Sequence, residues 1–115
     1  MATLDELNAQ MGQFVKMDSE LGFDQFVAYY NDLMAFLQAE YADLDQDALV
    51  KCKGMCMIVA GNAKMRALRK DANRKKFTKM GEKAYFWEDA IARRLKKDGL
   101  SEDELNDRVG ALWEE

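Results

Sequence analysis

The chain has 115 residues, with no histidine, no proline and two cysteines, and its formal net charge is −4. Its length fits one domain, residues 1–115, whose core needs neither disulfides nor metals. The lack of histidine excludes Ser-His-Asp and Cys-His catalysis and removes the commonest protein ligand of zinc.

The first two predicted helices occupy residues 3–17 and 24–41. The first begins with a capping box at Thr3. The second carries apolar residues on more than one side, because Tyr29 and Phe36 lie off its main apolar face. A second covered side requires either the fourth helix or another copy of the protein, and apolar surface that one small bundle cannot cover often marks an interface. We therefore predict a symmetric homodimer, with Tyr29 and Phe36 as the candidate self-association residues.

The loop before the next helix has aspartates at alternate positions, Asp43, Asp45 and Asp47. This spacing is that of the start of a calcium-binding loop. However, Ala48 stands where such a loop needs glycine, and Gly54 stands where it needs a bidentate glutamate. We therefore predict that the aspartates cap a helix instead.

Residues 45–70 predict a central helix, with apolar residues recurring every three or four positions. Six consecutive apolar residues, 55–60, leave no polar face there, which predicts burial on several sides. Gly54 and Gly61 lie seven residues apart on one face. We expect both to allow a neighbouring helix to approach closely, and the alternative is that one of them ends the helix.

Cys52 and Cys56 share a face of this central helix. One pair of thiols is short of the four ligands of a structural zinc site, although two chains could together supply four. We expect both cysteines to be core residues, with zinc and redox chemistry as alternatives. No spacing of carboxylates, lysines or tyrosines singles out a catalytic pair, so we predict neither an active site nor a cofactor.

Residues 70–77 either turn near positions 71–73 or continue the central helix, and the usual length of helices favours the turn. The fourth helix carries one clean apolar face and ends before Gly99, and a second capping box at Ser101 begins a short last helix. No stretch alternates with the period of a strand. The expected fold is all-α, a mostly antiparallel bundle of four main helices plus a short C-terminal helix.

The charges are strongly segregated along the chain. Residues 1–50 contain ten acids and one lysine, whereas residues 64–97 contain thirteen basic residues and four acids. Tyr85 and Phe86 lie beside these cations, off the apolar face, a combination typical of single-stranded nucleic-acid binding. The alternative, which we favour because the whole chain is acidic, is a solvated face balanced by the acidic helices. The possible polyanion contacts are Arg69, Lys70, Arg74, Lys75, Lys76 and Lys79.

The amino terminus has no basic segment followed by an apolar run, and no apolar stretch reaches the roughly 20 residues that cross a bilayer. A chain with two cysteines and no disulfide framework is typical of a reducing compartment. We therefore predict a small cytoplasmic, non-catalytic protein that does not enter membranes and acts as a self-associating interaction or regulatory module. The alternative function is a nucleic-acid-binding accessory protein that uses residues 64–97.

Overall fold

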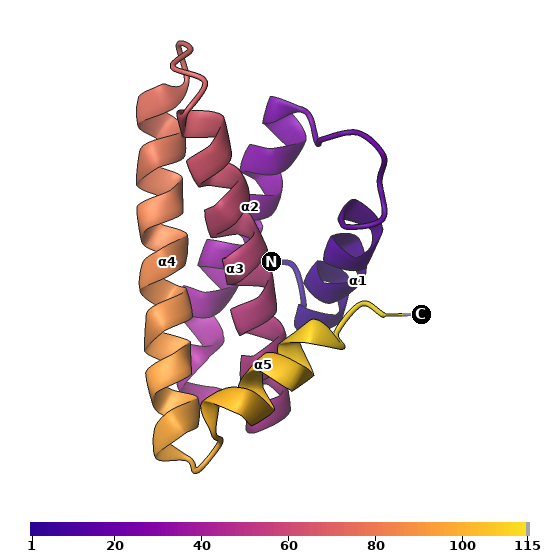
Figure 1. The fold of residues 1–115 in the computed structure, drawn as a ribbon, viewed down its shortest axis with the longest axis vertical. Coiled ribbons are helices and arrows are strands. Elements are labelled where there is room, and N and C mark those ends of the chain that lie inside the picture. Colours follow the sequence, from indigo (N-terminus) through magenta and orange to yellow (C-terminus); the bar gives the residue numbers. More distant parts are fainter. Residues whose placement is uncertain (115) are drawn as a thin grey trace.

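The computed structural model describes residues 1–114, and these residues form helices and no strand. The helices are α1 (Leu4–Phe14), α2 (Phe23–Glu40), a 3-10 turn η1 (Tyr41–Asp43), α3 (Gln46–Ala67), α4 (Arg74–Lys97) and α5 (Glu102–Gly110). In Figure 1, α2, α3 and α4 run side by side along the long axis, α1 lies on the other side of α3 from α4, and α5 crosses the amino-terminal half of α3. The all-α bundle predicted from the sequence is confirmed.

The helix termini follow the local sequence signals. Thr3 and Ser101 each form a complete capping box. Asp45 accepts a hydrogen bond from the backbone N–H of Ala48 at 2.8 Å, which is the capping role predicted for it. Gly99 has a φ of 95°, in the left-handed region that glycine adopts without steric cost.

Helix α1 ends earlier than the sequence predicted, and the structure decides between the two alternatives for the segment between α3 and α4. Helix α1 ends at Phe14 and not near Met17, because the chain tightens there into backbone bonds between residues three apart. Residues 68–73 form a turn between α3 and α4, so the alternative of one continuous helix is wrong. Asp71 stabilises this turn by accepting a hydrogen bond from the N–H of Asn73 at 2.8 Å.

Helix α3 supplies the centre of the core. Cys52, Cys56 and Val59 are buried, as predicted for the central helix. The predicted burial on several sides has an exception within the apolar run at Met57, whose side chain is 41% exposed. One face of α3 therefore has no neighbour within the chain. Among residues 1–114 no helix combines the length and apolarity that a membrane span requires.

The expectation that Tyr29 and Phe36 remain uncovered on α2 is wrong. Both are buried within the single chain, Tyr29 to 5% exposure. The ring of Phe14 packs edge-on against Tyr29 with centroids 5.3 Å apart, and the Tyr29 hydroxyl donates to the carbonyl oxygen of Leu7 at 2.9 Å. Helix α1 therefore covers Tyr29, one of the two residues predicted to contact a second copy.

The two glycines of α3 have different surroundings. A Cβ on Gly54 would overlap Cδ1 of Leu112 and lie 3.1 Å from the ring of Trp113, so a close approach is confirmed there, although it is made by the turn that follows α5 and not by a helix. Trp113 also donates from Nε1 to Asn8 at 3.2 Å, which ties the C-terminal segment to α1. Around Gly61 no atom lies within 4 Å of such a Cβ, and the predicted packing role is wrong for this residue.

Candidate interaction surface

Exposed large apolar side chains gather on α3 and α4. Eight such side chains occur in the described residues, three of them in the first 17 residues and five on α3, its C-cap or α4. These five are Met57, Met65, Leu68, Tyr85 and Phe86. Small soluble domains rarely leave a large apolar patch uncovered unless it contacts another molecule.

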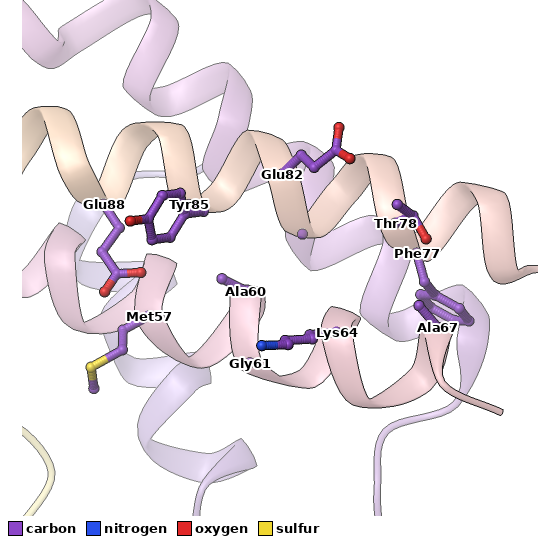
Figure 2. Close-up of a pocket in the computed structure, with 11 residues that line it drawn as sticks. Met57, Ala60, Gly61, Lys64, Ala67, Phe77, Thr78, Glu82, Tyr85 and Glu88 are labelled. Atoms are coloured by element: carbon purple, nitrogen blue, oxygen red, sulfur yellow. The ribbon is translucent and has the colours of Figure 1, made fainter.

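A groove of about 530 Å³ runs between α3 and α4 and is open to solvent. Its lining residues are Met57, Ala60, Gly61, Lys64, Ala67, Phe77, Thr78, Gly81, Glu82, Tyr85 and Glu88. In Figure 2 the side chain of Glu88 extends from α4 toward α3 near Met57, the ring of Tyr85 lies alongside α4 next to Glu88, and Lys64 lies beyond Ala60 and Gly61. The groove therefore has an apolar and aromatic end, a floor of small residues and a cationic side. We call this set of residues the α3–α4 groove.

The floor of the groove follows from residue size. A Cβ on Gly81 would lie 3.4 Å from Cβ of Ala63, so this glycine allows α4 to approach α3 closely. A Cβ on Gly61, by contrast, would meet no atom of residues 1–114 within 4 Å, so the size of this residue is not limited by a neighbouring helix. In the middle of a helix glycine costs about 1 kcal/mol relative to alanine. Gly61 has no packing partner within the chain that would account for this cost.

Charges line both sides of the groove. Glu88 accepts from Nζ of Lys53 at 3.4 Å, and both side chains are mostly buried. Lys64 on α3 and Glu82 on α4 form no ion pair with any of residues 1–114. One cation and one anion of the groove are therefore available to another molecule.

The cysteines lie in the core and not in the groove. Both are free thiols and fully buried. Burial raises the pKa of Cys52 to about 12, and burial with the nearby Cys56–Cys52 repulsion raises the pKa of Cys56 far above its ordinary value. A protonated, buried thiol is a poor nucleophile and metal ligand, so the core role predicted for both is confirmed. Within residues 1–114, no three Asp, Glu or Cys side chains gather as metal ligands.

One arginine of the basic segment is part of the core. Arg66 is only 4% exposed, and its guanidinium lies over the ring of Phe26, 4.4 Å from the centroid, and near that of Phe77. It donates to the carbonyl oxygen of Leu21 at 2.8 Å, while its Nε has no hydrogen-bond partner. Arg66 therefore joins α3 to the loop before α2 and contributes nothing to a surface site.

Of the six candidate polyanion contacts, three are not part of a common cationic surface. Arg69 donates to both carboxylate oxygens of Glu20, at 2.6 and 2.5 Å, which lowers the pKa of Glu20. Lys76 lies over the ring of Phe23, 5.6 Å from its centroid. Lys70 is an exposed residue of the turn, with a φ of 56°.

The other three candidates, Arg74, Lys75 and Lys79, line one shallow hollow of about 490 Å³ together with Thr78 and Glu82. We call it the cationic hollow. None of its three cations forms an ion pair with any of residues 1–114. These three cations are therefore solvated and form no direct ion pair with an acidic side chain of another helix among residues 1–114.

The sequence analysis noted Tyr85 and Phe86 but did not find the groove. Both rings are exposed, Tyr85 to 62% and Phe86 to 63%, as expected for residues off the apolar face. Met57 and Gly61 were missed because the first belongs to an unbroken apolar run and the second was interpreted as a packing residue. No protein-family model, curated protein or solved structure matches this chain.

Proposed function

We propose that this protein is a non-catalytic interaction module that self-associates, and that a second copy of the chain occupies the α3–α4 groove. The observation that carries this proposal is the groove itself, an open hollow with apolar and aromatic lining that no other part of residues 1–114 fills. The proposal moves the interface from Tyr29 and Phe36, which are buried in the monomer, to Met57 and Tyr85, which are not.

The groove supplies the apolar part of such an interface. Burial of apolar surface contributes roughly 25 cal/mol per Å², and methionine and tyrosine are enriched where proteins meet. Gly61 and Ala60 have no large side chain to hold a second helix away. Two α3–α4 pairs packed through their grooves would form a four-helix arrangement, with the same kind of helix packing that each chain uses internally.

The charges of the groove favour a second copy as the occupant. Lys64 and Glu82 come from different helices, and neither has an ion-pair partner among residues 1–114. A two-fold axis through an isologous interface repeats every contact twice. If the two-fold axis passes through the groove, Lys64 of each copy faces Glu82 of the other copy. The same Lys64–Glu82 ion pair then forms twice. A surface that carries both signs in this way is complementary to itself.

We place this module in the cytoplasm. Its two thiols are free, and free thiols are typical of reducing compartments. This part of the proposal rests on chemistry alone, and localisation of a tagged full chain tests it.

Light scattering coupled to size-exclusion chromatography, from low to high micromolar concentration, tests the self-association. We expect the wild type to shift from monomer to dimer as concentration rises. Tyr85→Glu should weaken the dimer at least tenfold, because it puts an unpaired charge against the apolar part of the interface. A tenfold weaker dimer corresponds to about 1.4 kcal/mol of association free energy, which is at the lower end of the cost of truncating a central interface residue.

Val15→Glu is the matched control, because Val15 is also an exposed apolar residue but lies outside the groove. It should dimerise like the wild type. A wild type that remains monomeric at high micromolar concentration would contradict the proposal, as would a dimer that Tyr85→Glu leaves intact while its helical circular dichroism is unchanged.

A further inference from the structure

The solvent side of α4 carries a row of cations without partners. Lys75, Lys79 and Lys83 follow one another at intervals of four residues, so they rise along the helix in steps of about 6 Å. None of them has an ion pair within residues 1–114. Arg74 joins them at the cationic hollow, and the one acid lining that hollow is Glu82. A polyanion that follows the helix meets a free cation at each turn.

An aromatic ring continues this row. Phe86 lies one turn beyond Lys83 and is 63% exposed. Its ring packs edge-on against Trp87, with centroids 5.8 Å apart and planes at 79°, and Trp87 in turn contacts Tyr41. The ring is therefore open to solvent on one side and supported on another, which is the arrangement that stacks a nucleobase.

This row adjoins the proposed dimer interface at one edge, because Thr78 and Glu82 line both the α3–α4 groove and the cationic hollow. At about 100° per residue, Phe86 and Lys79 lie roughly 140° and 160° around α4 from Gly81, which faces α3. On the same measure Lys75 and Lys83 lie roughly 120° and 160° from Gly81, so the three lysines and Phe86 stay open when the groove is filled, whereas Arg74, roughly 20° from Gly81, lies at the edge nearest the groove.

We infer that the row Arg74, Lys75, Lys79, Lys83 and Phe86 binds single-stranded nucleic acid, with phosphates on the cations and a base stacked on Phe86. The lining of the cationic hollow contains no apolar side chain that would receive a protein helix. Counterion release supplies the affinity, and stacking on Phe86 adds to it without reading sequence. The inference does not depend on dimerisation.

Fluorescence anisotropy with a labelled single-stranded DNA of mixed sequence, about 20 nucleotides long, tests this inference at several salt concentrations. We expect micromolar affinity that falls steeply with salt. Each phosphate contact contributes a slope of about −0.7 in log affinity against log salt for single strands, so four cations predict a slope near −3. Single-stranded RNA of the same sequence should bind similarly, because no base edge is read.

Two variants separate the two kinds of contact. Replacing Lys75, Lys79 and Lys83 with glutamine should weaken binding at least tenfold and reduce the slope by about two. Phe86→Ala should weaken binding roughly fivefold or more and leave the slope unchanged, since stacking releases no counterions.

The matched control replaces Lys51, Arg93 and Arg108 with glutamine, which removes the same charge from cations that have ion-pair partners. This control should bind like the wild type. The inference would be overturned if the control weakened binding as much as the first triple variant does. It would also be overturned if the wild type did not bind at micromolar concentration in low salt. Binding to vesicles of anionic lipid with none to the oligonucleotide would overturn it as well. Tyr85→Glu should still bind DNA, so failure here and failure of the dimer are distinguishable.

Discussion

The two faces of α3 have nearly the same apolar character and different surroundings. On one face Cys52, Cys56 and Val59 are buried against the other helices, whereas on the other Met57 and Gly61 are exposed to solvent. The difference shows that apolarity along a helix does not determine which side is covered. The number and position of the neighbouring helices determine it. In this chain the other helices cover one side of α3, and they leave Met57 and Gly61 on the groove side, and Asn62 and Met65 beyond it, exposed.

The largest expected effect contrasts these two faces directly. Val59→Asp buries an unpaired carboxylate in the core and should cost several kcal/mol, enough to unfold the domain. Met57→Asp, two residues away on the open face, should keep the fold. Circular dichroism with thermal unfolding measures both. Retention of a cooperative transition in Val59→Asp would mean that the core is misplaced.

The second prediction compares two arginines close in sequence. Arg66 is buried and donates to Leu21, so Arg66→Met should cost about 1.5–3 kcal/mol through the lost charged hydrogen bond. Arg69→Met removes an exposed ion pair with Glu20 and should change stability very little. Urea unfolding of the two variants compares these costs. Equal destabilisation would show that Arg66 is not a structural contact.

The third prediction concerns the buried thiols. Replacing Cys52 and Cys56 together with alanine should cost on the order of 1–2 kcal/mol, because the loss is of packing alone. Folding raises the pKa of Cys52 from 9.0 to about 12, so the thiols contribute stability that is complete below pH 9.0 and lost as pH rises through 12. The alkaline loss of stability should therefore be smaller in the double variant.

The reactivity of the two thiols and the zinc content of the protein test the same prediction chemically. In the native wild type at neutral pH neither thiol should react with an aromatic disulfide reagent, and both should react after unfolding. Stoichiometric zinc in protein purified without chelators, lost in the double variant, would contradict the core role and would favour a shared metal site.

The smallest expected effect separates the two glycines of α3. Gly61→Ala should raise stability by up to about 1 kcal/mol, since the new methyl group meets no atom. Gly54→Ala should have a lower melting temperature than Gly61→Ala, because the new methyl group displaces Leu112 and Trp113. Gly110, which is exposed and also has open space above it, provides a control for the alanine substitution itself. Equal melting temperatures for the first two variants would show that α5 does not pack closely on α3.

Local signals were sufficient to predict most of the fold. The capping residues Thr3, Asp45 and Ser101 and the left-handed Gly99 act within a few residues, so a single sequence contains all the information they need. The number and order of helices followed from the same signals together with the 3.6-residue period. The end of α1 was missed by three residues because no strong terminator stands there.

The candidate site could not be predicted in the same way, because it depends on contacts between distant segments. Tyr29 was expected at an interface, yet Phe14 and Leu7 of α1, which lie 15 and 22 positions earlier in the chain, cover it. Gly61 was expected to pack, yet no helix reaches it. The cations of α4 were expected to have acidic partners, but acidic composition elsewhere in a chain does not bring a carboxylate within range of a particular lysine.

Cross-linking at single cysteines tests most directly the claim that the open face of α3 is where two copies meet. Gly61→Cys, in a background where Cys52 and Cys56 are alanine, puts one thiol at the floor of the groove. Asp32→Cys in the same background puts it on the exposed side of α2. With a short bifunctional maleimide, we predict a covalent dimer for the first protein and monomer for the second. A dimer that cross-links through residue 32 and not through residue 61 would contradict the account.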